Sequence, residues 1–139
     1  MTEQQIKLVK KSWSFFREIK PEVVADAFYS KLFMDNPSLR KMFPNDMKMQ
    51  YGKLIDMLNI VVARLDRLDE LTDDIIEMGV RHKGYGVKPE QYAMVGNALL
   101  WTLKNGLGND WNNDIENAWT ACYTLLSNAM IVASEESVI

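Results

Sequence analysis

The chain has 139 residues, of which 47% are hydrophobic and 25% are charged, and its net charge is −3. The length suits a single domain over 1–139, and the negative charge argues against nucleic acid as a partner, because binding to phosphates depends on clustered Lys and Arg. No apolar run approaches the ~20 residues of a membrane helix, and the N-terminus lacks the apolar core of a signal peptide, so we expect a cytoplasmic protein without a membrane partner.

Apolar residues recur at helical spacing along the chain and predict an all-α fold with six major helices and one short turn helix. All four prolines and most glycines fall between the periodic segments rather than inside them. Residues 133–139 are the C-terminal end of the chain, and we expect them to fray. The predicted helices run from Thr2 to about Ile19, from Pro21 to Asp35, from Met47 to Leu65, from Thr72 to Gly84, from Pro89 to Leu103 and from about Asn113 to Met130, with the turn helix at Leu39 to Phe43.

Residues at the ends of these segments match known helix signals. Thr2 and Gln5 have the spacing of a capping box at the start of the first helix. Thr72 is the expected N-cap of the fourth helix, and Gly84 is its expected end. Pro89 suits the first turn of the fifth helix, because proline lacks only an N–H that would have no partner there.

The residue inventory excludes several classes of site. With one histidine, His82, and one cysteine, Cys122, the chain cannot build the usual zinc site. It also lacks a glycine-rich phosphate loop after a strand and the nucleophile elbow of a serine hydrolase. Cys122 lies at helical spacing from Trp119 and Leu126, which predicts a buried thiol.

His82 is the residue most suggestive of function. It lies four residues after Met78 and seven after Ile75, so it shares their apolar stripe and should point inward. Two interpretations follow. One is a core histidine hydrogen-bonded to a carbonyl group, and the other is the single protein ligand of a b-type haem iron. The spacing of the residues does not decide between them.

The segment from Arg81 to Trp111, with "AWTACY" after it, resembles the proximal half of globins. The resemblance is to single-domain bacterial haemoglobins and to the globin domain of flavohaemoglobins, and it extends more weakly over residues 3–133. It implies a globin fold around a haem pocket, in which His82 is the axial ligand of haem b. The matching positions are His82, Tyr85, Gly86, Val87, Tyr92, Val95, Gly96, Leu99, Leu100, Leu103, Leu107, Gly108, Trp111, Trp119 and Tyr123.

The same resemblance assigns the other residues of the haem pocket. Phe43 matches the phenylalanine that wedges against the porphyrin, and Gln50 follows only seven positions later, so the small helix that some globins carry there should be missing. On the distal side, Tyr29 and Gln50 would face the gaseous ligand, together with Leu54. The remaining cofactor contacts are assigned to Val87, Tyr92 and Val95, and the propionate partners to Lys53, Arg81 or Lys83.

The resemblance implies reversible binding of dioxygen, as in an oxygen carrier or store, with NO and CO as further gaseous ligands. One alternative is a nitric oxide dioxygenase, which would need a separate reductase because no flavin or nicotinamide domain fits within 139 residues. Another is a haem-based gas sensor or a helical interaction domain that has lost haem. We expect a monomer or a weak homodimer.

One departure from the family pattern concerns peroxide chemistry. Bacterial globins with strong activity of this kind carry a glutamate on the last helix, against the tyrosine that follows the proximal histidine. This chain has that tyrosine, Tyr92, but Ser134 occupies the glutamate's position and Glu135 comes one place later. Adjacent residues on a helix point about 100° apart, so we expect weak peroxidase activity.

Overall fold

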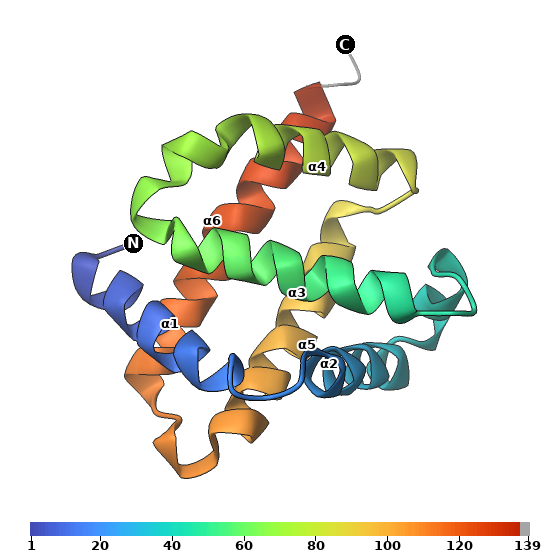
Figure 1. The fold of residues 1–139 in the computed structure, drawn as a ribbon. Coiled ribbons are helices and arrows are strands. Elements are labelled where there is room, and N and C mark those ends of the chain that lie inside the picture. Colours follow the sequence, from blue (N-terminus) through green and yellow to red (C-terminus); the bar gives the residue numbers. More distant parts are fainter. Residues whose placement is uncertain (137–139) are drawn as a thin grey trace.

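The computed structural model describes residues 1–136, which form six α-helices and three short 3₁₀ segments and contain no strand (Figure 1). The predicted all-α class is confirmed, with six major helices as expected. Their bounds are α1 Glu3–Phe16, α2 Pro21–Asp35, η1 Pro37–Met42, α3 Lys48–Ala63, η2 Leu65–Leu71, α4 Thr72–Gly84, α5 Pro89–Leu107, η3 Gly108–Asp110 and α6 Asn113–Glu136.

The helices cross one another around one core, with α1 and α4 packed against α6, and α3 and α5 packed against α2. Helix α6 is crossed by α4 near its C-terminal end and by α1 further down, while α2 packs against both α5 and α3 (Figure 1). Such crossings are how helical domains bury their apolar stripes without a sheet. Helices α3 and α4 are joined by η2; α3 carries Gln50 and Leu54, α4 carries His82, and Tyr29 lies on α2. The largest fully buried side chains are Trp119, Leu32, Leu71, Leu103, Val9 and Val62.

Helix α1 begins as predicted and ends three residues early. The Thr2 hydroxyl accepts a hydrogen bond from the Gln5 backbone N–H, and the Gln5 side chain accepts one from the Thr2 backbone N–H, which completes the capping box. The helix ends at Phe16 instead of Ile19. Pro21 disfavours the helical conformation at the residue before it, and Lys20 accordingly has extended backbone angles (φ −57°, ψ 129°).

The junction between α3 and α4 corrects two predictions. Helix α3 ends at Ala63 rather than Leu65, and a 3₁₀ segment, η2, follows it directly. Thr72 is not an N-cap, because η2 continues into α4 and leaves Thr72 with helical backbone angles. Its hydroxyl donates instead to the Asp69 carbonyl at 2.9 Å.

Two further helix ends extend past their predicted positions. Helix α5 runs to Leu107, and the expected loop after it contains the short segment η3. Helix α6 runs to Glu136, past the predicted end at Met130, and Ala133 is buried. A buried alanine anchors the last turns of the helix to the core. Residues 137–139, the rest of the predicted frayed tail, lie outside the described part of the chain.

Helices α4 and α6 approach closely at Gly79, and this contact fixes the helix that carries His82. A Cβ atom built on Gly79 would lie 2.4 Å from the backbone oxygen of Met130, which cannot move aside as a flexible side chain can. Gly79→Ala should therefore lower the free energy of unfolding by about 1–3 kcal/mol through overpacking. Chemical denaturation measures the change, and Gly52→Ala is the matched control, because a Cβ at Gly52 meets no atom within 4 Å.

The buried thiol of Cys122 gives the fold a dependence on alkaline pH. Burial raises its pKa from 9.0 to about 12, so the thiol stays protonated in the folded chain after it has ionised in the unfolded chain. The stability from this group is complete below pH 9 and declines as the pH rises towards 12. Cys122→Ala should show a shallower loss of unfolding free energy than the parent protein between pH 9 and 11. Equal slopes in the two proteins would contradict this prediction.

Candidate functional site

The distal part of the candidate site is built on a hydrogen bond between α2 and α3. The Gln50 side-chain amide donates to the hydroxyl of Tyr29 at 3.0 Å, and the Tyr29 side chain is buried. Burial raises the pKa of the Tyr29 phenol, although the hydrogen bond from Gln50 acts in the opposite direction. A hydroxyl that accepts from Gln50 still has its own proton to donate. Tyr29 therefore remains a neutral hydrogen-bond donor.

Aromatic rings hold Tyr29 in this orientation. Its ring stacks on Tyr51 with centroids 5.6 Å apart and an angle of 13° between planes, and it meets Phe43 edge-on at 5.5 Å. The Tyr51 hydroxyl donates to a carboxylate oxygen of Asp26 at 2.8 Å, which ties α3 to α2 a second time. Phe33 contacts both Tyr29 and Phe43. Tyr51 and Asp26 carry no signal in the sequence that marks them as site residues.

The segment before α3 is held by one arginine. Residues 43–47 form no helix, as predicted. Instead, the Arg40 guanidinium donates to the carbonyl oxygens of Phe43, Pro44 and Asn45 at 2.9–3.2 Å, and it lies over the Phe33 ring. Arg40 thus fixes the backbone that positions Phe43. A planar guanidinium with five N–H donors can bind several carbonyl oxygens at once. The spacing of residues in the sequence does not predict this role for Arg40.

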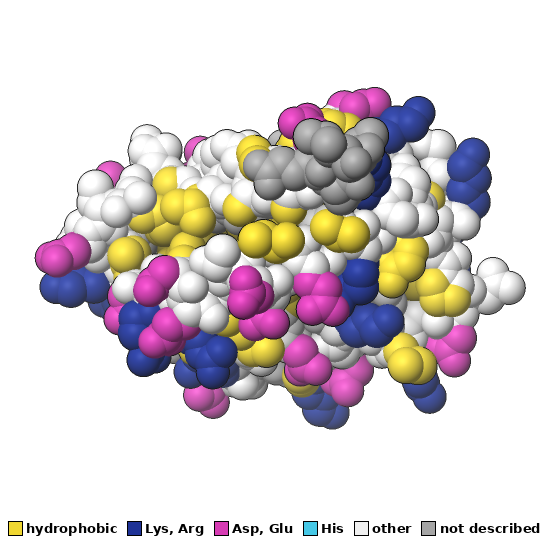
Figure 2. Space-filling view, turned by 90° about the horizontal axis from the view of Figure 1, so that it is seen from above, with side chains coloured by type: hydrophobic (Ala, Val, Ile, Leu, Met, Phe, Trp, Pro, Cys, Tyr) yellow, Lys and Arg dark blue, Asp and Glu magenta, His cyan; other side chains and the backbone are white. Residues whose placement is uncertain are grey.

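The proximal part of the site is His82, two residues before α4 ends at Gly84. Its Nδ1 lies 2.7 Å from the Met78 carbonyl oxygen. Because a carbonyl can only accept, Nδ1 must carry the proton, and Nε2 keeps a free lone pair. Burial lowers the pKa of the imidazole, which favours this neutral form. Figure 2 views the molecule from above, on the α4 side, and no histidine colour is visible on the part of that face that the grey atoms leave open.

The Nε2 atom of His82 has no hydrogen-bond partner among the described residues. Among the described residues, every buried side-chain nitrogen or oxygen that solvent cannot reach has a hydrogen-bond partner. Because Nε2 has none, it must be accessible. The apolar residues assigned to the haem pocket, Phe43, Leu54, Val87 and Val95, are all half-buried against the core. Each keeps apolar surface that a further hydrophobic body could cover. An accessible neutral imidazole beside half-covered apolar side chains fits a haem group.

The ring of Tyr92, on α5, lies next to that of His82. The two ring centroids are 6.4 Å apart, and Tyr92 is buried with the pKa of its phenol raised by that burial. The Tyr123 hydroxyl donates to the Tyr92 backbone oxygen at 2.6 Å and ties α5 to α6. Tyr123 is packed over Gly96, where a Cβ atom would lie 2.8 Å from its ring.

The basic residues proposed for the propionates differ in their engagement. Arg81 forms an ion pair with Glu77 at 3.0 Å, and Lys83 donates to the backbone oxygen of Ser134 at 3.0 Å. Lys53 is exposed and has no ion pair or hydrogen bond within the described residues.

The Ser134 hydroxyl donates to the Ile131 carbonyl, and Glu135 is exposed.

The predicted site residues form two clusters. Tyr29, Phe43 and Gln50 are joined by the contacts described above, and His82 is joined to Tyr92, but among residues 1–136 no hydrogen bond, ion pair or ring contact links one cluster to the other. A cavity of about 410 Å³ reaches Tyr29 and Tyr51 from the 45–48 segment, and His82 does not line it. No cluster of three or more His, Cys, Asp or Glu is arranged to hold a metal in the described chain. A metal here would depend on His82 and a cofactor.

Comparison with known proteins decides the family. The family model for globins matches residues 26–130, which include both clusters. The chain belongs to the globin family. It is therefore a haem-binding protein for gaseous ligands, and the resemblance found in the sequence is confirmed. By length and hydropathy, none of its described helices qualifies as a membrane span.

This globin is similar to proteins of two kinds. It is 27% identical to a flavohaemoprotein of Vibrio cholerae over 94% of this chain, and 30% identical to that of Bacillus subtilis over 79%. The chain spans about a third of the length of these relatives, 34% and 28% respectively. It is also 28% identical to neuroglobin-2 of Oncorhynchus mykiss, with 94% of this chain and 90% of that protein aligned.

Solved structures agree on the fold. A bacterial globin from Campylobacter jejuni superposes with a TM-score of 0.85 at 22% identity and covers 99% of both chains. An engineered carbene transferase built on a candidate nitric oxide dioxygenase from Rhodothermus marinus gives a TM-score of 0.86 at 22% identity, covering 99% of this chain and 96% of that one. At this level of identity the likeness concerns the globin fold alone.

Proposed function

We propose that the globin binds dioxygen reversibly as a carrier or store, with His82 as the axial ligand of haem b. Two observations carry this proposal: a neutral imidazole whose Nε2 lone pair has no hydrogen-bond partner among the described residues, and a buried phenol whose proton is not donated to any of them. Ferrous haem supplies the iron at which a gaseous ligand binds. The protein supplies the ligand to that iron and the polarity of the space beside it.

Each side of the site has a separate task. The Met78 carbonyl holds the His82 proton on Nδ1 and orients the ring, so Nε2 is kept available to the metal. Phe43, Leu54, Val87 and Val95 would cover the porphyrin faces and exclude water from them. Tyr29 would donate to a ligand on which negative charge has accumulated, and Gln50 would hold the phenol in place. Lys53 is the preferred candidate for a propionate, since it forms no ion pair or hydrogen bond among residues 1–136.

The second candidate function is nitric oxide dioxygenation with a separate reductase. It is favoured by the similarity to flavohaemoproteins, of which this chain matches about a third. The same distal phenol would serve both activities, so the residues of the pocket do not distinguish oxygen binding from NO dioxygenation. The two functions differ in their need for electrons, because a dioxygenase requires a reductase to return the iron to the ferrous state.

One preparation tests the proposal. The purified protein should show a strong Soret band, bind one haem per chain, and release dioxygen reversibly through repeated cycles of oxygenation and argon flushing. Turnover of NO with a generic flavin reductase should remain slow. Rapid, sustained NO consumption under these conditions would favour the dioxygenase, and absence of a Soret band after haem addition would refute both functions.

A further inference from the structure

Two stacked tyrosines connect the distal part of the candidate site to the surface. The Tyr29 ring is buried in the core, and the Tyr51 ring lies against it, with centroids 5.6 Å apart and an angle of 13° between the planes. Tyr51 is only half-buried, so part of its side chain remains accessible. Aromatic rings stacked this closely can exchange an electron directly, because their π-systems face each other. The pair therefore offers electrons a path between the distal side and the protein surface.

The Tyr51 hydroxyl has a base beside it. It donates to the carboxylate of Asp26 on α2 at 2.8 Å, and Asp26 is exposed to solvent. Burial and this hydrogen bond raise the pKa of the Tyr51 phenol, which therefore carries its proton in neutral solution. A phenol that loses an electron becomes a strong acid, so its oxidation is fastest where a positioned base accepts the proton in the same step. Asp26 can accept this proton and pass it to water.

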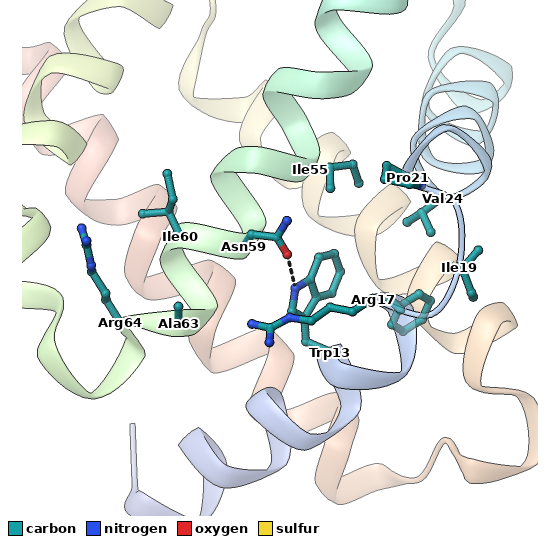
Figure 3. A pocket seen from close by; sticks show the side chains of 11 residues that line it. Trp13, Arg17, Ile19, Pro21, Val24, Ile55, Asn59, Ile60, Ala63 and Arg64 are labelled. Carbon is teal, nitrogen blue, oxygen red and sulfur yellow. Dashed lines mark hydrogen bonds between the residues drawn. The ribbon is translucent and has the colours of Figure 1, made fainter.

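The other oxidisable rings lack this arrangement. The chain has five tyrosines and four tryptophans, and Tyr51 alone among them donates to a carboxylate within residues 1–136. The Trp13 indole N–H donates to the amide oxygen of Asn59 at 2.8 Å (Figure 3), and a neutral amide is not a base that takes up the proton. The exposed ring of Trp101 lies under the Lys31 ammonium group, 5.2 Å from the ring centroid, and a positive charge there opposes the removal of an electron.

We propose that Tyr51 is a one-electron oxidation site, at which phenolic reductants supply the electrons for reduction of a hydroperoxide at the haem. Tyr29 carries each electron inward, and Asp26 takes the proton from Tyr51. A cavity of about 410 Å³ has Tyr51 in its wall and side chains of both charges, Asp46 and Lys48, in its lining, so it suits a small neutral phenol. The route through Tyr29 rests on its proposed distal position, whereas the oxidation of Tyr51 does not.

The reaction balances when Tyr51 is oxidised and reduced twice for each hydroperoxide. The hydroperoxide takes up two electrons and two protons as its O–O bond breaks, and it leaves as an alcohol and water. In each turn Tyr51 gives one electron to Tyr29 and one proton to Asp26, and becomes a neutral phenoxyl radical. A phenol in solution returns a hydrogen atom to that radical, and Asp26 releases its proton to water. Two phenols are thus converted into two phenoxyl radicals for each hydroperoxide that is reduced.

Weak peroxidase activity is expected of this chain, so the first test asks where a radical forms rather than how fast peroxide is consumed. Ferric holoprotein with ring-deuterated tyrosine is mixed with hydrogen peroxide, freeze-quenched and examined by electron paramagnetic resonance, in which deuteration identifies tyrosyl radicals. The tyrosyl signal should lose most of its intensity in Tyr51→Phe. It should persist in Tyr85→Phe, because Tyr85 is exposed but forms no hydrogen bond to a carboxylate in the described chain. A parental signal in Tyr51→Phe would overturn the proposed site.

Asp26→Asn tests the base, with an external oxidant that does not need the haem. Ruthenium(III) tris-bipyridine, generated by a laser flash, oxidises the holoprotein while cyanide occupies the ferric iron. Asp26→Asn should slow formation of the Tyr51 radical on the order of 100-fold, because an amide oxygen accepts the hydrogen bond but not the proton. Added phosphate, a base in solution, should recover part of this rate in Asp26→Asn and leave the parental rate unchanged, which a purely structural role of Asp26 would not produce. Equal rates in the two proteins would overturn the role of Asp26.

Two further variants separate the route from the site. Asp56→Asn removes an exposed carboxylate of α3 that accepts no hydrogen bond from a tyrosine among residues 1–136, and it should keep the parental rate. Tyr29→Phe should delay the Tyr51 radical with peroxide but not with the ruthenium oxidant, because a phenylalanine ring is much harder to oxidise. An undelayed radical with peroxide would overturn the route through Tyr29. Failure of reversible oxygenation in the parent would refute the proposed function, and the ruthenium results would still decide whether Tyr51 is the oxidation site.

Discussion

Replacing His82 by alanine should remove most of the bound haem from this globin. The change deletes the only imidazole in the chain, and the described residues offer no other side chain with a free ring nitrogen beside the apolar surfaces of Leu54, Val87 and Val95. We expect haem affinity to fall on the order of 100-fold, which corresponds to about 2.7 kcal/mol. Transfer of haem to apomyoglobin, followed at the Soret band, measures this loss.

Stability should follow haem retention. A ligand that binds only the folded chain stabilises it by about 2.7 kcal/mol at 100 times its Kd, so the variant should unfold at a lower temperature than the parent holoprotein. Added imidazole should restore part of the Soret band, because it replaces the missing side chain. Tyr85→Phe is the matched control: its ring lies 6.3 Å from that of His82, but it is exposed and should retain haem. A parental Soret band and transfer rate in His82→Ala would show that His82 is not the axial ligand.

The helices were predictable from the sequence because their apolar stripes are long and proline marks their starts. Pro21 and Pro89 begin α2 and α5 where expected, since each fixes backbone angles locally. The junction at Thr72 was not predictable in the same way. Whether a threonine caps a helix depends on the preceding backbone, and here η2 leads straight into α4.

The site shows a similar division. Gln50 and Leu54 lie four residues apart on α3, and His82 lies one turn after the Met78 carbonyl that its Nδ1 contacts, so local spacing was sufficient to predict which way these side chains point. Their roles beside haem come from the resemblance to globins and stay predictions. The carbonyl partner and the proposed metal-ligand role of His82 are compatible, because one ring nitrogen can serve each. Arg40 and the Tyr51–Asp26 hydrogen bond depend on how α2, η1 and α3 meet in space. Tertiary contacts of this kind leave no periodic signal in the chain.

Removing the hydroxyl of Tyr29 should make dioxygen leave about 10–100 times faster. A hydrogen bond to a partly charged ligand contributes about 1.5–3 kcal/mol, and Tyr29→Phe removes the donor while keeping the buried ring. Gln50→Leu should have a smaller effect, because Gln50 acts on the ligand through the phenol that it holds. Stopped-flow displacement of dioxygen by CO gives the rates. An unchanged rate in Tyr29→Phe would assign the distal role to Gln50 or to water.

Tyr51→Phe and a pH series show whether the phenol proton itself causes this effect. Tyr51→Phe makes the same chemical change on the stacked neighbouring ring, whose hydroxyl bonds Asp26, so dioxygen should leave at close to the parental rate. Burial raises the pKa of Tyr29 above its usual value near 10, so the donor keeps its proton throughout neutral and mildly alkaline solution. The parental rate should therefore be constant between about pH 6 and 9. If the rate instead rose within that window, and the rise disappeared in Tyr29→Phe, the Tyr29 phenol would be ionising in the folded protein. A phenolate cannot donate a hydrogen bond, so this result would contradict the proposed role of Tyr29 in oxygen binding.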